Sequence, residues 1–148
     1  MLLNMKQMLS VAMEQNFAVP AFNISDYAML NGIMQAAEEM KSPVIIEIHP
    51  NELLHLGEEA VCAIREMSHR ASVPVTIHLD HGSDFAQIMK AIRCGFTSVM
   101  IDGSALPFEE NIEICRKVVE AAHAVNVSVE GELGTIGSTD AQAEGREN

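Results

Sequence analysis

The sequence has few aromatic and few basic side chains. Its 148 residues include no Trp and one Tyr, and aromatic residues make up 4% of the chain. Nine Lys and Arg stand against 21 Asp and Glu, which gives a formal net charge of −12 at pH 7. The chain therefore lacks both a stacking platform for bases and the clustered cations that neutralise phosphates. We expect no nucleic-acid partner and no binding to an anionic membrane surface.

Paired cysteines and long apolar runs are also missing. Cys62, Cys94 and Cys115 are odd in number and lack CxxC spacing, and each falls in an apolar helical pattern, which predicts buried free thiols. No continuous apolar run reaches the length of a signal-peptide core or a membrane span, so we expect a cytoplasmic protein without a membrane partner. The remaining composition, 48% hydrophobic and 20% charged, is typical of one globular domain with a sizeable core.

The chain alternates short β-rich runs with amphipathic helical segments. The runs VIIEI, PVTIHL and SVMID are almost continuously apolar, as in strands that are covered on both faces of a parallel sheet. The predicted strands are Ala18–Asn23, Pro43–His49, Pro74–Asp80, Ser98–Gly103 and Ser128–Leu133. The predicted helices are Asn4–Gln15, Asp26–Met40, Glu58–Ala71, Asp84–Cys94 and Glu109–Val125.

This βα repeat fits either a doubly wound open sheet or a (βα)8 barrel, both of the α/β class. No G-x-G-x-x-G motif follows the first strand, which argues against the dinucleotide-binding open sheet. Five strands carry polar groups at their carboxyl ends, which favours the barrel, because barrel active sites are assembled at that face. These groups are Asn23, Glu47 with His49, Asp80 with His81, Asp102 and Glu132.

A complete barrel takes roughly 250 residues, so five strands cannot close one. We therefore predict that residues 1–148 are the amino-terminal part of a single (βα)8, or TIM, barrel domain, with about five strands and four to five helices. The glycine-rich, polar stretch 135–148 predicts a mobile active-site loop.

The motif His78-Leu79-Asp80-His81-Gly82 is the strongest candidate for chemistry. Strand alternation places His78 and Asp80 on one face, and His81 follows where the backbone turns. A histidine there can bind a metal, and an adjacent aspartate can act as a general acid or base. Spacing alone leaves the alternative open, a buried histidine with a helix-capping aspartate.

Further carboxylates follow the other strands. Glu130 and Glu132 alternate on one strand face, and like charges so close require a cation, a proton or solvent between them. Asp102 precedes Gly103 and fits either a ligand or an ordinary turn residue. Glu47 and His49 alternate on the second strand and fit either a ligand role or a structural hydrogen-bonded pair.

Lysines do not end any predicted strand. Each of them falls on a predicted helix or at its end: Lys6, Lys41, Lys90 and Lys117. Since a Schiff-base mechanism requires a desolvated lysine in the pocket, these residues offer no candidate for it.

Six segments of the sequence resemble the class II, zinc-dependent fructose-/tagatose-bisphosphate aldolases. They are Val19–Asn23, Ser42–Ile46, His78–Gly82, Gly95–Ser104, Leu106–Asn111 and Val129–Gly134. The resemblance covers essentially the whole chain in order and implies the amino-terminal half of a TIM-barrel aldolase. It implies a lyase of carbohydrate metabolism and glycolysis that takes a phosphorylated sugar as its substrate. The reaction cleaves a ketose 1,6-bisphosphate into dihydroxyacetone phosphate and an aldehyde such as glyceraldehyde 3-phosphate, or forms it from them. The resemblance also implies Zn2+, with a second divalent or monovalent cation as an addition, and a homodimer or homotetramer.

The resemblance assigns roles to individual residues. His81 matches a zinc-binding histidine, and Asp80 matches the aspartate that exchanges a proton with the C4 hydroxyl. Asp102 and Glu132 match carboxylates associated with an alternative or neighbouring metal position. Asn23 matches an active-site asparagine near the substrate.

The sequence also departs from the family pattern. Glu47-Ile48-His49-Pro50 stands where many relatives have a small or hydroxyl residue, which makes Glu47 and His49 candidate substrate-binding residues and points to another substrate. Asp140 is the remaining candidate for a catalytic acid in the loop after Glu132. The resemblance places two further zinc-binding histidines and most phosphate-binding loops in the second half of the barrel. Residues 1–148 alone are therefore expected to bind zinc weakly and to be inactive. The alternatives are a non-catalytic aldolase-like barrel subunit and an aldolase acting on a different phosphorylated sugar.

Overall fold

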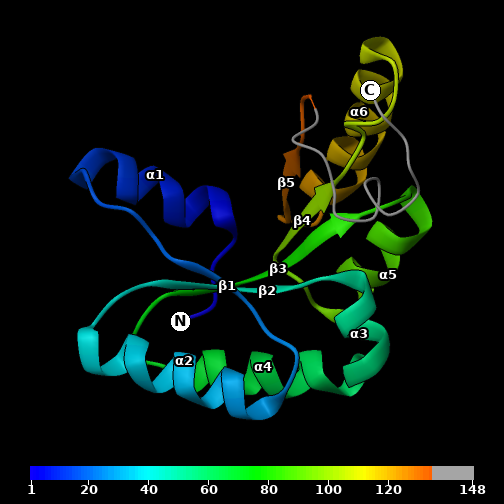
Figure 1. Ribbon diagram of the computed structural model, residues 1–148. Helices are drawn as coiled ribbons and strands as arrows, with labels where there is room; N and C mark the ends of the chain where they lie inside the picture. Colours follow the sequence, from blue (N-terminus) through cyan, green and yellow to red (C-terminus); the bar gives the residue numbers. More distant parts are fainter. Residues whose placement is uncertain (135–148) are drawn as a thin grey trace, which may run out of the picture.

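The computed structural model describes residues 1–134, which form five parallel strands alternating with helices (Figure 1). The strands are β1 (Ala21–Asn23), β2 (Val44–Ile48), β3 (Val75–Gly82), β4 (Ser98–Ile101) and β5 (Ser128–Gly131). The helices are α1 (Met5–Gln15), α2 (Tyr27–Met40), α3 (Pro50–Leu56), α4 (Glu58–Arg70), α5 (Phe85–Cys94) and α6 (Phe108–His123). Neighbouring strands follow the order β1-β2-β3-β4-β5 without a reversal. A doubly wound sheet reverses its strand order at a switch point, so this order is that of a barrel segment.

Local signals set most helix boundaries where the sequence predicted them. Asn4 and Gln7 form a capping box at the start of α1, and Asp26 and Asp84 accept backbone N–H groups at the starts of α2 and α5. The helix α3 was not predicted, which gives six helices in the described residues instead of four to five. Pro50 occupies the first turn of α3, where its missing N–H costs nothing.

The sheet has an apolar face packed on helices and a more polar face. The helix-packed face contributes much of the buried core: Val44, Ile46, Ile48, Val75, Ile77, Leu79, Val99 and Ile101. The helices α2, α4, α5 and α6 contact these strands and cover this face. The alternating positions on β2 to β5 include Glu47, His78, Asp80, Met100 and Glu130, which therefore point to the opposite side of the sheet. In a closed barrel that side is the interior.

The segment before α1, together with the first residue of that helix, covers the amino-terminal ends of the strands. Thr76 and Thr97 each donate a side-chain hydrogen bond to the carbonyl oxygen of Leu3, at 3.1 and 2.8 Å. The N–H of Met5 donates to Ser128 Oγ at 3.0 Å. Because the amino-terminal ends are occupied in this way, the carboxyl ends of the strands are the face available for a site.

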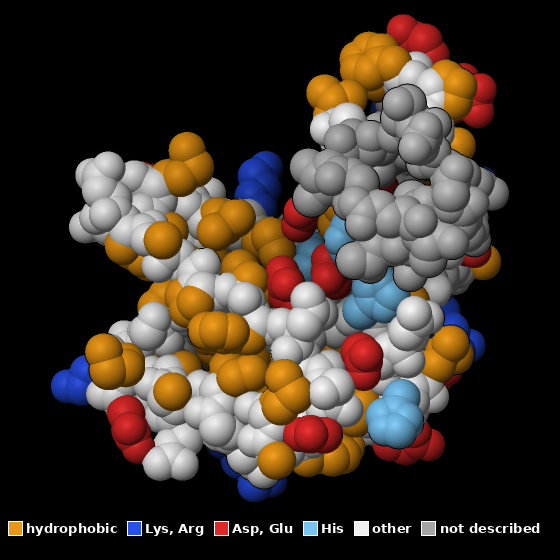
Figure 2. Space-filling model, viewed as in Figure 1, with side chains coloured by type: hydrophobic (Ala, Val, Ile, Leu, Met, Phe, Trp, Pro, Cys, Tyr) orange, Lys and Arg blue, Asp and Glu red, His pale blue; other side chains and the backbone are white. Residues whose placement is uncertain are grey.

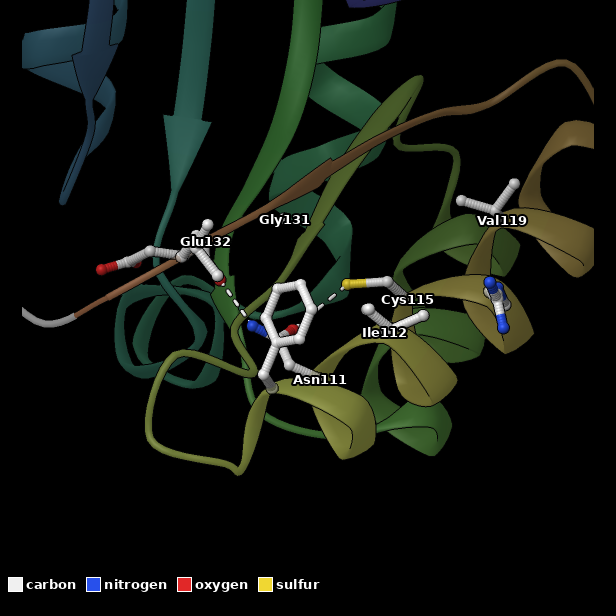
Figure 3. A pocket seen from close by; sticks show the side chains of 9 residues that line it. Asn111, Ile112, Cys115, Val119, Gly131 and Glu132 are labelled. Carbon is white, nitrogen blue, oxygen red and sulfur yellow. Dashed lines mark hydrogen bonds between the residues drawn. The ribbon is translucent and has the colours of Figure 1, made fainter.

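Both edges of the sheet border apolar recesses. The recess of about 570 Å³ beside β1 lies against α2 and includes Phe22, Ile33 and Met40. The recess of about 330 Å³ beside β5 lies against α6 and includes Ile112, Cys115 and Val119 (Figure 3). Apolar surface along two unpaired edges is what a barrel segment exposes where further βα units would pack.

The structure corrects one expectation about the cysteines. All three are free, but Cys62 is exposed, and Cys94 and Cys115 are only partly buried. Cys62 lies off the face of α4 that contributes Val61 and Ile64 to the core, so its apolar sequence context was misleading. Within residues 1–134, the helices are too short or too polar for any of them to span a bilayer.

Candidate metal and acid–base site

The site lies at the carboxyl end of β3, where the strand is irregular. The register between β3 and β4 shifts between Leu79 and Gly82, and His81 has a left-handed backbone with φ of 48°. Bulges of this kind change the direction in which side chains point. Gly82 is required there, since an added Cβ would lie 2.5 Å from the carbonyl oxygen of Met100. The irregularity allows Asp80 and His81, which are consecutive, to face the same site.

His81 meets two carboxylates from the next two strands. Its Nδ1 lies 3.0 Å from Asp102 Oδ2 and 3.8 Å from Glu132 Oε2. One ligand atom from each of these three side chains lies within 4.8 Å of the others. Figure 2 shows acidic and histidine side chains gathered in a hollow near the centre of the viewed face. An imidazole nitrogen with two carboxylate oxygens is a donor set that fits a divalent cation such as zinc.

The pKa values of these groups reflect their hydrogen bonds. The hydrogen bond to Asp102 raises the pKa of His81 above its usual range. Burial acts to raise the pKa of Asp102, but hydrogen bonds from Ser104 and His81 outweigh it and lower the pKa overall. Ser104 donates from its backbone N and its Oγ to Asp102 Oδ1, at 3.0 and 2.6 Å, which leaves Oδ2 for His81. Asp102 is therefore held ionised and oriented, as a metal ligand must be.

Glu132 is anchored through its backbone. The buried Asn111 of α6 donates from Nδ2 to the carbonyl oxygen of Glu132 at 2.7 Å. Figure 3 shows the Glu132 carboxylate pointing away from Asn111, so that the backbone and the side chain of Glu132 serve opposite sides. Gly103 makes room for this anchor, since a Cβ there would lie 2.3 Å from Asn111 Oδ1.

Asp80 lies beside His81 and is hydrogen-bonded to Asn23 of β1. Its Oδ1 is 3.7 Å from His81 Nε2, and its Oδ2 accepts a hydrogen bond of 2.9 Å from Asn23 Nδ2. The same Nδ2 donates to Glu47 Oε2 at 3.3 Å. Burial first, and then the negative charges of Asp80 and Glu130, raise the pKa of Glu47 to about 6. Asp80 is thus a hydrogen-bond acceptor next to His81. The Asn23 amide links it to Glu47, so residues of β1, β2 and β3 are connected.

His78 lies between Ser98 and Glu130 on the face of the sheet that carries Asp80. His78 is 1% exposed; its Nδ1 lies 2.8 Å from Ser98 Oγ and its Nε2 lies 3.3 Å from Glu130 Oε2. Burial lowers the pKa of His78 to about 4, so the ring is neutral at pH 7. Burial also raises the pKa of Glu130 above its usual range. His78 is therefore a buried, neutral ring that bonds Ser98 and faces Glu130.

His49 lies at the rim of the site. It follows β2 as the N-cap of α3, where its Nδ1 accepts the N–H of Asn51 at 3.2 Å. Its ring centroid is 6.2 Å from that of His81. Because Nδ1 is used as an acceptor, the neutral His49 ring carries its hydrogen on Nε2.

Seven sequence-predicted site residues lie at this end of the sheet: Asn23, Glu47, His49, Asp80, His81, Asp102 and Glu132. Asp140 and the predicted loop 135–148 lie outside the described residues. Sequence reasoning assigned no role to Ser98, Ser104 or Asn111. Only the spacing of Ser104 two residues after Asp102, a common side-chain-to-backbone pattern, could have indicated one of these contacts.

Comparison with known proteins gives consistent similarities. The family model described as fructose-bisphosphate aldolase class-II matches residues 3–148. A fructose-bisphosphate aldolase of Geobacillus stearothermophilus is 46% identical over 143 residues, covering 94% of this chain and 50% of the relative. A sulfofructosephosphate aldolase of Alkalicoccus urumqiensis is 43% identical over 136 residues, covering 91% of this chain and 47% of the relative.

A solved structure is also similar. The crystal structure of the YdjI aldolase from Escherichia coli K12 superposes with a TM-score of 0.85 at 36% identity. The alignment covers 90% of this chain and 51% of that one. The chain thus spans about half the length of the relatives that it matches.

Proposed function

The chain belongs to the class II fructose-bisphosphate aldolase family, and from this membership we propose that it carries the amino-terminal half of a zinc-dependent aldolase site. The reaction is the reversible cleavage of a ketose 1,6-bisphosphate of the fructose or tagatose type. Its products are dihydroxyacetone phosphate and an aldehyde such as glyceraldehyde 3-phosphate. The observation that carries this proposal is the grouping of His81, Asp102 and Glu132 beside Asp80.

The proposed metal ligand is His81, with Asp102 and Glu132 at the same or a neighbouring cation position. A divalent cation bound there would act as a Lewis acid that polarises the substrate carbonyl. The C3–C4 bonding electrons could then remain on C3 when the bond breaks. The carboxylates of Asp102 and Glu132, both near His81 Nδ1, would offset the charge of such an ion. The remaining family ligands are expected outside residues 1–148, so these residues alone should bind zinc weakly and remain inactive.

Asp80 is the proposed acid–base residue. In cleavage its carboxylate takes the proton of the C4 hydroxyl as the C3–C4 bond breaks and the C4 carbonyl forms. In condensation the same carboxyl group returns that proton to the C4 oxygen. The Asn23 hydrogen bond at 2.9 Å supports this role, because it holds one carboxylate oxygen and leaves Oδ1 on the side of His81. Asp140 is proposed as the acid that protonates C3 after cleavage.

Cleavage of a different phosphorylated sugar is the second candidate function. One relative is a sulfofructosephosphate aldolase, so a different phosphorylated sugar is compatible with membership. We propose that His49 contacts the substrate, because it lies at the rim with its Nε2–H available and its ring close to His81. A ring N–H donor at that position suits a phosphate or sulfonate oxygen.

Cleavage assays with and without zinc test the proposed function. The intact protein, which carries the whole barrel and not residues 1–148 alone, is freed of metal with a chelator and assayed with fructose 1,6-bisphosphate, tagatose 1,6-bisphosphate and other ketose phosphates. Activity should disappear with the chelator and return with zinc, and borohydride with substrate should trap no covalent adduct. A trapped adduct would reject the metal-dependent mechanism. Zinc binding without cleavage of any tested sugar would favour the non-catalytic barrel subunit.

A further inference from the structure

The Asn23 side chain forms two hydrogen bonds with two carboxylates. Its Nδ2 group donates to Asp80 Oδ2 at 2.9 Å and to Glu47 Oε2 at 3.3 Å. Asn23 pairs with Glu47 in the register between β1 and β2, so the bridge from Glu47 to Asp80 links three adjacent strands. Both N–H donors of the amide are thereby used.

Two ionised carboxylates determine the orientation of such an amide. A carboxylate only accepts hydrogen bonds, whereas an amide carries donors on nitrogen and an acceptor on oxygen. If the Asn23 amide rotated by half a turn, its Oδ1 would face two acceptors and both hydrogen bonds would be lost. With Glu47 removed, only Asp80 would hold the amide, and rotation would become easier.

No other contact in residues 1–134 accounts for Glu47. It forms no ion pair with a lysine or arginine there. It is also not one of the three side chains that could hold a metal ion, which are His81, Asp102 and Glu132. Its carboxyl group is half-buried and faces the charges of Asp80 and Glu130, with His81 offsetting them only in part. A carboxylate in such surroundings costs folding free energy, which is typical of groups retained for function.

We propose that Glu47 is a positioning residue that acts through Asn23 and keeps the Asn23 amide donating to Asp80. The sequence suggested that Glu47 contacts the substrate, whereas the geometry gives it an indirect role: it orients Asn23, which in turn holds the acid–base residue Asp80. This inference rests on the proposed function, since Asp80 matters to turnover only if it moves the C4 proton. Glu47 thereby determines how long Asp80 holds the orientation in which it can reach that hydroxyl.

A double-mutant cycle in the intact, zinc-loaded protein, which carries the whole barrel, tests this role. Glu47→Leu keeps the approximate size of the side chain but has no oxygen, so it removes the acceptor of the Asn23 hydrogen bond. We expect kcat to fall about tenfold, as for a small misplacement of a reacting group, while KM stays within about twofold. Asn23→Ala should reduce kcat at least as much. The double variant should be no slower than Asn23→Ala, because Glu47 acts only through Asn23.

Two results would overturn the inference. If the effects of the two substitutions on kcat multiply, Glu47 acts independently of Asn23. If Glu47→Leu raises KM and leaves kcat unchanged, Glu47 contacts the substrate. Glu120→Leu removes an exposed carboxylate of α6 and is the matched control, with no change expected in either constant.

A measurement without turnover separates this inference from the proposed function. The side-chain amide signals of Asn23 are assigned by ¹⁵N NMR in the purified protein and compared between wild type and Glu47→Leu. Loss of the carboxylate acceptor should shift one amide proton upfield and speed rotation of the amide, whereas Glu120→Leu should leave both signals in place. Unchanged signals in Glu47→Leu would refute the positioning role. Failure of the wild type to cleave any ketose phosphate would instead refute the proposed function and leave this readout valid.

Discussion

His81 and Asp102 lie 21 residues apart in sequence, and their side chains meet with Nδ1 3.0 Å from Oδ2. The contact joins β3 to the loop after β4 and leaves Glu132 close enough for all three to share one ion. A proton on His81 and a metal ion would compete for the same electron pair, so the observed ion pair and the proposed metal site would be alternative states of these three side chains.

Removing His81 should weaken zinc binding. We expect His81→Ala to raise the zinc Kd by at least about 100-fold, because a direct ligand contributes at least as much as the outer-shell groups that orient it. Competition with a chromophoric chelator at pH 7.5 measures this Kd. His69→Ala, which changes an exposed histidine of α4, is the control and should leave the Kd unchanged. Equal Kd values for the two variants would exclude His81 as a ligand.

Replacing Asp80 should separate catalysis from metal binding. Asp80→Asn preserves the shape of the side chain but cannot take a proton, so kcat should fall by roughly 10²–10⁴-fold. Zinc content, measured by atomic absorption after dialysis, should stay near that of the wild type. A variant that keeps its rate, or one that loses its zinc together with its activity, would argue against Asp80 as the acid–base residue.

Gly103 should not tolerate an added side chain, whereas Gly32 should. Gly103→Ala places a Cβ 2.3 Å from Asn111 Oδ1, so Asn111 must move and release the carbonyl of Glu132. We expect a loss of about 1–3 kcal/mol in unfolding free energy, as for overpacking, together with weaker zinc binding. Urea unfolding and the zinc Kd measure the two effects.

Gly32→Ala is the matched control for that substitution. Within residues 1–134, a Cβ at Gly32 in α2 meets no atom within 4 Å apart from its chain neighbours and the backbone of its own helix. Since alanine favours a helix over glycine, this change should stabilise the protein by about 0.5–1 kcal/mol. If Gly103→Ala were equally harmless, the close approach of Asn111 to Gly103 would not matter for the anchor of Glu132.

His78 should make the protein sensitive to acid. Its pKa is about 4 in the folded state against 6.5 in the unfolded chain, so the unfolded state binds more protons between these values. Stability contributed by the neutral ring is therefore present above pH 6.5 and lost as the pH falls toward 4. The slope is at most about 1.4 kcal/mol per pH unit.

Urea unfolding between pH 7.5 and 4.5 checks this prediction. His78→Gln removes the titrating group and keeps hydrogen-bonding capacity, so its unfolding free energy should fall less steeply with acid than that of the wild type. The exposed His69→Gln should follow the wild type. Parallel pH curves for the wild type and His78→Gln would show that protonation of His78 does not contribute.

Much of the fold follows from short-range signals in the sequence. All five predicted strands and all five predicted helices are present with shifted ends. β3 extends to Gly82, beyond its predicted end, because the Gly82 carbonyl accepts the N–H of Asp102 at 2.9 Å and prolongs the pairing with β4. The missed helix α3 begins at Pro50, a residue that also ends strands, and the sequence pattern does not distinguish the two uses.

The supporting residues of the site were harder to predict. Ser98 and Asn111 are ordinary polar residues at the start of a strand and in a helix. They acquire their roles only because β4 lies beside His78 and α6 lies beside Glu132. Both contacts bridge about 20 residues of sequence, and no local periodicity encodes them.

The sequence by itself determined the βα alternation, the chain direction of the strands and the end of the sheet at which the reactive side chains lie. These properties depend on periodicity, capping residues and strand length, all of which are local. The tertiary structure alone decided which side chains meet: His81 with Asp102 and Glu132, and Asn23 with Glu47 and Asp80. The physical reason is that such meetings depend on the register between strands and on the bulge of β3 with its left-handed His81, where a small change in backbone direction selects a different partner.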